Sequence, residues 1–214
     1  MPNFDVIVLG LGGMGVVYAA IQPLIGKPVA IRVLRPEVAR DPEQEQRLYL
    51  EAQAAAQVRH RSIIDVFTMG KLDDGRLYLV MEYLDGESVY ELLHRRGALP
   101  MREALLIVDQ VLAALHAAHQ AGLVHRDLKP SNIFMVNQAD GESFVKLLDF
   151  GLAKRGLGPA GQTPQTRTDV FVGTPEYVAP EQARGHPVGP ATDLYSLGVV
   201  LFELLTGRLP FLAT

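Results

Sequence analysis

The chain has 214 residues, 48% of them hydrophobic, and this length can bury a sizeable core as one large or two small domains. The composition excludes wholesale disorder, zero cysteines exclude disulfides and thiolate metal sites, and a net charge of −4 gives no reason to expect a nucleic-acid partner. Because no apolar run reaches the length of a membrane span and the first residues lack the pattern of a secretory signal, we expect a cytoplasmic protein.

A glycine-rich segment follows the first predicted strand. Residues 4–9 are apolar and β-branched, which predicts a strand, and residues 10–15 contain four glycines that allow backbone amides to approach phosphate oxygens. Two nucleotide sites fit this pattern. One is a glycine-rich β-hairpin, and the other is the dinucleotide fold of flavin- or NAD-dependent oxidoreductases, in which the glycines begin a helix.

The residues after the glycines favour the hairpin. Val16 and Val17 are β-branched, which favours a second strand. Arg32 stands where a dinucleotide fold would place the acid that binds ribose, and Pro23 and Pro28 would cut its helix short.

The next elements complete a small domain. Residues 29–34 predict a third strand, and Asp41, Pro42 and Glu43 begin a helix that continues to about residue 58. Residues 64–70 and 77–82 predict two further strands joined by a turn. We therefore expect five short strands and one helix.

The remaining elements are mainly helical. We expect helices over residues 88–95 and 100–121, a hairpin that pairs 133–136 with 144–148, and a buried helix that begins near residue 191 and ends at Gly207. His116 and His119 lie three apart on the second of these helices. No third metal ligand accompanies them, so we interpret both as ordinary helix residues.

Two short motifs carry the chemistry. Asp127 is placed to accept a proton and Lys129 to neutralise a phosphoryl group, while Asn132 and Asp149 offer oxygens to a divalent metal. This pattern is typical of γ-phosphoryl transfer to a hydroxyl, which depends on positioning and charge neutralisation. A polar loop with an unrelated Asp-Phe-Gly turn is the alternative, and the order of the motifs around a strand-like segment disfavours it.

These motifs resemble the catalytic loop and metal-binding turn of the eukaryotic-type protein kinases, which also occur in bacteria, and the resemblance covers about residues 6–211. It implies an α+β, bilobal protein-kinase-like fold. A small five-stranded antiparallel lobe with one helix, residues 1–84, would bind ATP. A mainly helical lobe, residues 85–214, would carry the catalytic loop and lack its last helices. The implied activity is serine/threonine protein kinase activity with ATP and Mg²⁺, and Thr174 would hydrogen-bond toward Asp127 and Lys129.

The resemblance also implies an ATP site. Its residues are Leu9, Gly10, Gly12, Gly13, Gly15, Val17, Ala30, Arg32, Glu51, Met81, Glu82 and Leu84. Val17 would cap the adenine, Met81 would lie at the back of its pocket, and residues 82–84 would form the hinge. Arg32 departs from the family, which has a lysine there that contacts phosphates and pairs with the helix glutamate, here Glu51. Arginine is not a conservative replacement at a crowded phosphate site.

Other family features concern regulation and support. Arg126 would pair with a phosphate on the activation segment, residues 152–178, where Thr163, Thr166 and Thr168 are candidate sites; a merely polar loop is equally compatible. Thr166 and Thr168 match the family's spacing best, and the chain could phosphorylate them itself. Asp193 would hold the backbone of the catalytic loop from below.

The family's catalytic domain continues for several helices past the position of Thr214. We therefore expect a truncated gene, a fragment, or a domain completed by another chain, with Glu181 left without its usual arginine and one face of the last helix bare. Together with Arg32, this keeps open a nucleotide-binding pseudokinase as the alternative function. The presence of Asp127, Lys129, Asn132 and Asp149 opposes that alternative.

Overall fold

The computed structural model describes residues 6–12, 15–36, 42–138, 143–150 and 175–211. The chain forms two compact units: one comprises residues 1–59 and 64–85, and the other comprises residues 60–63 and 86–214. None of the helices within the described ranges is long and apolar enough to cross a bilayer.

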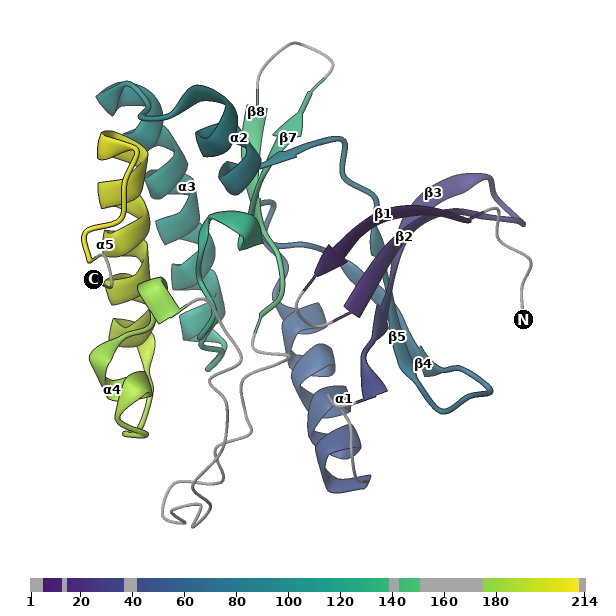
Figure 1. Cartoon of the computed structure of the whole chain (residues 1–214). Helices are drawn as coiled ribbons and strands as arrows, with labels where there is room; N and C mark the ends of the chain where they lie inside the picture. The colour runs from purple at the N-terminus through teal and green to yellow at the C-terminus, as the bar shows by residue number, and fades with distance from the viewer. Residues whose placement is uncertain (1–5, 13–14, 37–41, 139–142, 151–174, 212–214) are drawn as a thin grey trace. The chain divides into compact units, whose positions relative to one another are not determined.

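The first unit is an antiparallel sheet with one helix, as the sequence predicts (Figure 1). Its strands are β1 (Val6–Gly12), β2 (Gly15–Gln22), β3 (Lys27–Leu34), β4 (Val66–Lys71) and β5 (Leu77–Glu82), in the spatial order β1-β2-β3-β5-β4. The helix α1 (Pro42–Gln57) buries Leu48 and Ala52, and an ion pair of 2.8 Å joins its Glu45 to Lys71 on β4.

The glycine-rich segment forms a β-hairpin. Strand β1 runs through the first glycines, pairs Leu11 with Val16 and Gly12 with Gly15, and is followed by a strand rather than a helix. The dinucleotide-fold alternative, which needs a helix at this point, is therefore wrong. Gly15 is required by the fold itself, because a Cβ there would lie 2.0 Å from the carbonyl oxygen of Val33.

The second unit is mainly helical. It contains α2 (Val89–Arg96), α3 (Met101–Gln120), α4 (Pro180–Ala183) and α5 (Pro190–Thr206), with short 3₁₀ turns at Pro130–Asn132 and Pro175–Tyr177. Strands β6 (Gly86–Ser88), β7 (Ile133–Asn137) and β8 (Ser143–Leu147) form a small sheet in that order. The hairpin β7–β8 confirms the sequence prediction, whereas β6 lies where the sequence indicated only a boundary.

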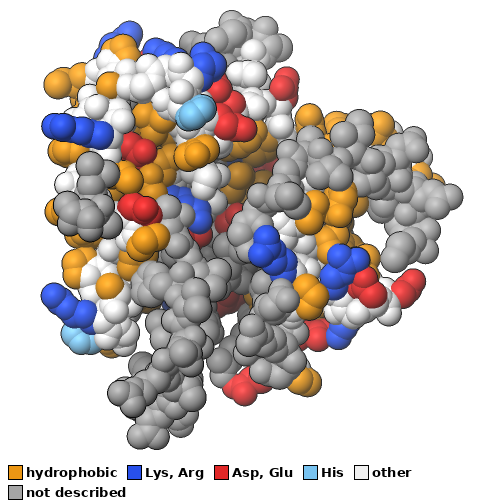
Figure 2. Space-filling model, viewed as in Figure 1, with side chains coloured by type: hydrophobic (Ala, Val, Ile, Leu, Met, Phe, Trp, Pro, Cys, Tyr) orange, Lys and Arg blue, Asp and Glu red, His pale blue; other side chains and the backbone are white. Residues whose placement is uncertain are grey.

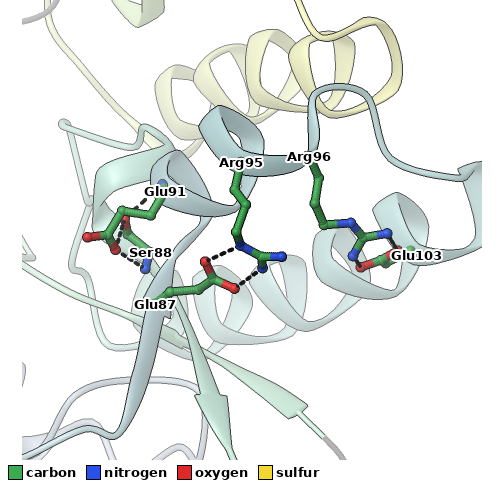
Figure 3. A network of polar contacts seen from close by, with 6 residues as sticks. All are labelled: Glu87, Ser88, Glu91, Arg95, Arg96 and Glu103. Atoms are coloured by element: carbon green, nitrogen blue, oxygen red, sulfur yellow. Dashed lines mark hydrogen bonds and ion pairs between the residues drawn. The ribbon is translucent and has the colours of Figure 1, made fainter.

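Polar contacts set the start of α2 and tie it to α3 (Figure 3). Ser88 caps α2: the Glu91 amide donates to its hydroxyl at 3.2 Å, and the Ser88 amide donates to the Glu91 carboxylate at 2.7 Å. The Arg96 guanidinium makes two hydrogen bonds to Glu103, at 2.6 and 2.9 Å. These contacts explain why α2 begins at residue 89.

Helices α3 and α5 lie side by side and run antiparallel (Figure 1). The Leu99 amide, just before α3, donates to the carbonyl of Leu204 near the end of α5 at 2.7 Å. The core between them includes Val111, Leu115 and Val200. Helix α5 is not buried all round, since Leu194 is 50% exposed, and Figure 2 shows hydrophobic side chains among charged ones on the visible surface of this unit.

Candidate active site

The catalytic loop, residues 123–132, brings three predicted catalytic side chains together. It follows α3 and the turn at Gly122, which has φ +76°, and it leads into β7. The Lys129 ammonium lies 2.9 Å from Oδ2 of Asp127. The Asn132 amide nitrogen donates to the same oxygen at 3.2 Å and to the Asp127 carbonyl at 2.7 Å. The carboxylate of Asp127 is therefore oriented by an ammonium and an amide inside the same loop.

The second motif is hydrogen-bonded to the first through the backbone. The Leu148 amide donates to the Asn132 carbonyl at 2.9 Å, so Asp149 directly follows a residue paired with the catalytic loop. Asp149 has φ +60°, which is uncommon for a non-glycine residue and fixes the turn at this point. Asp149 makes an interaction with another group of the chain. Asn132 and Asp149 thus belong to adjoining turns of one unit.

His125 is the buried polar centre of this region. It has no exposed surface; its Nε2 lies 2.8 Å from the Leu148 carbonyl, and the Asp127 amide donates to its Nδ1 at 3.3 Å. These partners select the neutral tautomer with the proton on Nε2. Burial lowers the pKa of His125, in agreement with a neutral ring. The ring also packs against Phe150, with the two centroids 4.8 Å apart.

Asp193, in the first turn of α5, holds the backbone of the catalytic loop, and this confirms the sequence expectation. Its side chain is fully buried and accepts hydrogen bonds from the amides of His125 at 2.9 Å and Arg126 at 2.8 Å. Arg126 has φ +65°, a conformation that an L-residue keeps only when its surroundings enforce it. The carboxylate therefore enforces the backbone shape that precedes Asp127.

His119 belongs to the same network, a role that its interpretation as an ordinary helix residue did not include. Its Nε2 lies 2.7 Å from Oδ2 of Asp193, and its side chain is only 13% exposed. The contact joins residues 74 positions apart, and nothing in the local spacing of His116 and His119 indicates it. The sequence signal for this contact is the expected supporting role of Asp193. A buried carboxylate with two amide donors can take a further donor, and a histidine on a neighbouring helix can supply it.

Glu181 differs from expectation as well. It is partly exposed, and the Thr192 hydroxyl donates to its Oε1 at 2.6 Å. This hydrogen bond is the main reason that the pKa of Glu181 lies below its ordinary value. The carboxylate, expected to lack its usual arginine, thus has a hydrogen-bond partner in the described part of the chain.

Part of the predicted ATP site lies on the sheet of the first unit. Gly10, Val17 and Arg32 oppose one another across β1, β2 and β3, and Ala30 on β3 opposes Met81 on β5. Directly opposed residues, and residues two apart on one strand, share a face of a sheet. The side chains of Val17, Ala30, Arg32 and Met81 therefore project from one face, where Ala30 and Met81 are buried.

Arg32 and Glu51 are the pair on which the departure from the family depends. Both have interaction partners, and their pairing with each other stays a prediction. Burial lowers the pKa of Arg32 to about 10, which leaves its guanidinium charged at neutral pH.

The remaining predicted ATP-site residues lie elsewhere in the first unit or outside the described residues. The Glu82 amide donates to the Asp65 carbonyl at 3.0 Å, so that N–H is already engaged within its unit. Leu84 follows the end of β5, and Leu9 and Gly12 lie in β1. Gly13, Thr174 and the three candidate phosphorylation sites, Thr163, Thr166 and Thr168, lie outside the described residues.

The oxygens of the second unit fit a small hard cation. Because Asn132 Nδ2 serves Asp127, the side-chain oxygen is the atom that Asn132 can offer, and Asp149 adds a carboxylate. Mg²⁺ takes oxygen ligands and is typically held by one or two protein groups together with water and substrate phosphates. No cluster of three or more His, Cys, Asp or Glu suited to a metal occurs within the described ranges, which leaves this sparse donor set as the candidate.

Comparisons with known proteins agree on one family. The family model of the protein kinase domain matches residues 5–214. The chain is 46% identical over 203 residues to serine/threonine-protein kinase Pkn1 of Myxococcus xanthus, covering 95% of this chain and 28% of that protein. It is 42% identical to serine/threonine-protein kinase PknB of Mycobacterium leprae, covering 96% of this chain and 32% of that protein. The chain thus spans about a third of the length of these curated relatives.

A solved structure gives the same result for the fold. The PknI kinase domain of Mycobacterium tuberculosis superposes with a TM-score of 0.77 at 32% sequence identity, over 98% of this chain and 77% of that one. The expected protein-kinase fold is confirmed.

Proposed function

The chain belongs to the protein kinase family, and we propose that it transfers the γ-phosphoryl group of ATP to serine and threonine hydroxyls of proteins. The observation that carries this proposal is the cluster of Asp127, Lys129 and Asn132, with its distances of 2.9 and 3.2 Å to one carboxylate oxygen, in a chain that matches the family from residue 5 to residue 214. Relatives named as serine/threonine-protein kinases support the class of acceptor.

The roles of the catalytic residues follow from their contacts. Asp127 orients the acceptor hydroxyl and accepts its proton, since its carboxylate is held in one orientation by its neighbours. Lys129, whose ammonium lies 2.9 Å from Oδ2 of Asp127, neutralises charge on the phosphoryl group as it moves. Asn132 and Asp149 hold the magnesium ion, which neutralises phosphate charge when bound. The family resemblance assigns Thr174, which lies outside the described residues, a hydrogen bond toward Asp127 and Lys129.

The nucleotide is assigned to residues 1–84 and the catalytic groups to residues 85–214. The sheet face that carries Val17, Ala30 and Met81 binds adenine, with hinge contacts from residues 82–84. The backbone of the glycine-rich hairpin approaches the phosphates, and Arg32, paired with Glu51, contacts them. The compact ammonium of a lysine would fit a crowded phosphate site better than the planar fork of Arg32.

Regulation and location are further parts of the proposal. Arg126 pairs with phosphate on Thr166 or Thr168 after self-phosphorylation. The absence of cysteine from the sequence favours a cytoplasmic location for these residues.

A transfer assay tests the function. The chain, incubated with Mg²⁺ and γ-labelled ATP, should label a generic protein substrate on serine and threonine, and Asp127→Asn should lose about a thousandfold or more of this activity while remaining folded. Asp109→Asn, at an exposed position on α3, serves as the matched control and should keep full activity. Equal labelling by the wild type and Asp127→Asn would contradict the proposal.

The same assay with Arg32→Lys separates an active kinase from a pseudokinase. If the wild type is inactive and Arg32→Lys transfers phosphate, the chain is a pseudokinase that Arg32 alone prevents from acting. A wild type with activity is an enzyme that uses arginine at this position.

A further inference from the structure

Gln182, the third residue of α4, joins two backbone groups from distant parts of the second unit. Its side-chain nitrogen donates to the Arg126 carbonyl at 2.8 Å, and its side-chain oxygen accepts from the Ala179 amide at 3.1 Å. A carbonyl can only accept and an amide N–H can only donate, so these partners fix the orientation of the Gln182 amide. The contact with Arg126 spans 56 positions of sequence.

The Arg126 backbone is the point on which this contact acts. Arg126 has φ +65°, and such a conformation in a non-glycine residue is maintained only by specific surroundings. Its N–H donates to Asp193 and its carbonyl accepts from Gln182, so both of its backbone polar groups are held by side chains of other elements. The peptide bond whose carbonyl Gln182 holds is the one that joins Arg126 to Asp127.

Gln182 and Asp127 also line the same small hollow, together with Arg126 and Tyr177. The hydrogen bonds of Asp193 hold this backbone from the side of α5, whereas the hydrogen bond of Gln182 holds it from the side of α4. Loss of the Gln182 contact would leave the Arg126 carbonyl without its side-chain donor, and the peptide plane between Arg126 and Asp127 would keep only the longer hydrogen bond from the Asp127 amide to His125, at 3.3 Å. The orientation of the Asp127 carboxylate would change with it.

We propose that Gln182 is a positioning residue for phosphoryl transfer: by holding the Arg126 carbonyl, it keeps Asp127 in the orientation that the acceptor hydroxyl requires. This proposal rests on the proposed kinase activity. It differs from a general structural role because Gln182 acts on the rate of transfer and not on the affinity for nucleotide.

Two substitutions separate the hydrogen bond from the space that the side chain fills. Gln182→Met keeps the length of the side chain but can neither donate nor accept as an amide does. It should lower kcat about tenfold and leave KM for ATP within about twofold, since a misplaced catalytic group costs rate rather than binding. Gln110→Met is the matched control: Gln110 accepts from the Val145 amide at 3.0 Å and donates to the Leu106 carbonyl at 3.2 Å, away from the catalytic loop. Its kcat should equal that of the wild type.

Gln182→Glu adds a readout that a structural role would not produce. An ionised carboxylate repels the Arg126 carbonyl, whereas a protonated one can donate to it as the amide does. The ratio of kcat between this variant and the wild type should therefore rise several-fold as the pH falls from 8 to 5.5. The charged or titratable groups around the same hollow, Arg126, Asp127 and Tyr177, are common to both proteins and cancel in the ratio.

Hydrogen exchange keeps the test independent of activity. Backbone amides of residues 123–132 should exchange faster in Gln182→Met than in Gln110→Met. If the wild type transfers no phosphoryl group, the proposed function fails and this exchange difference still decides whether Gln182 holds the loop. An active wild type with unchanged kcat in Gln182→Met, a flat pH ratio for Gln182→Glu, or equal exchange in the two methionine variants would overturn the proposal.

Discussion

The catalytic loop and the glycine-rich hairpin both carry phosphoryl-transfer motifs, but different interactions hold them in shape. Side chains from α3, α4 and α5 hold the loop, where buried Asp193 accepts hydrogen bonds from the amides of His125 and Arg126 and pairs with His119. The hairpin depends on strand pairing and on the close approach of Gly15 to Val33. We conclude that polar substitutions far from the loop will disturb it, whereas the hairpin responds mainly to changes in its own backbone.

The largest effect is expected for the carboxylate that holds the loop. Asp193→Ala removes the acceptor of two buried amides and the partner of His119, so the free energy of unfolding should fall by about 3–5 kcal/mol. Urea denaturation followed by circular dichroism measures this change. Asp109→Ala, at an exposed site on α3, should shift the midpoint very little. Similar losses of stability in both variants would contradict a special role for Asp193 in holding the catalytic loop.

The hairpin should respond to one methyl group. Gly15→Ala places a Cβ 2.0 Å from the Val33 carbonyl, and relief of that clash should cost about 1–3 kcal/mol of stability. Gly198→Ala, inside α5 with no heavy atom within 4 Å of the new Cβ, should instead stabilise the protein by about 0.5–1 kcal/mol. Thermal melts of the two variants should therefore shift in opposite directions. If Gly15→Ala left the melting temperature unchanged, the backbone of the hairpin would have to move enough to accommodate the new Cβ without cost.

The buried imidazole of the loop predicts a pH dependence of stability. Burial lowers the pKa of His125 below its ordinary 6.5. Between these two pKa values, the imidazole therefore binds a proton in the unfolded chain but not in the folded chain. The contribution of His125 is thus fully present above pH 6.5 and is lost as the pH falls toward the lowered value, by about 1.4 kcal/mol per pH unit at most.

The difference in unfolding free energy between the wild type and His125→Phe isolates this effect. That difference should shrink as the pH falls below 6.5, because phenylalanine cannot take up a proton. Exposed His116 supplies the control, since His116→Ala should run parallel to the wild type. A pH-independent difference for His125→Phe would mean that the ring has the same pKa in the folded and unfolded states, which would contradict the effect of its burial.

A smaller effect is expected for the helix residue that supports Asp193. His119→Ala leaves the carboxylate with its two backbone donors, so the cost should be about 1 kcal/mol. Denaturation beside His116→Ala, which should be close to neutral, measures it. If His119→Ala cost as much as Asp193→Ala, the two residues would act as one buried ion pair and the amides would contribute little.

The sequence predicts most of the fold because its signals are local. Apolar periodicity places α3 and α5, the turn glycines end them, and β-branched runs place the strands of the first sheet. The resemblance adds Asp193, whose role the hydrogen bonds confirm. These features depend on neighbours within a few residues or on motifs that the family shares.

The parts that the sequence did not predict depend on distant partners. His119 and Gln182 act across 74 and 56 positions, and neither spacing nor composition indicates such contacts. Glu181 was predicted to lack its usual arginine, and the sequence did not indicate that Thr192, eleven positions further on, donates a hydrogen bond to it. Gly15 had been assigned to phosphate binding alone, whereas its contact with Val33 gives a steric reason for glycine that is independent of any ligand.

Magnesium-dependent binding of ATP tests the central claim most directly, namely that Asn132 and Asp149 hold the metal that accompanies the nucleotide. Isothermal titration calorimetry with and without Mg²⁺ should show tighter ATP binding with the metal in the wild type, and the same affinity with and without it in a folded Asp149→Asn variant. An equal gain from Mg²⁺ in both proteins would contradict the account, since the metal would then be held elsewhere.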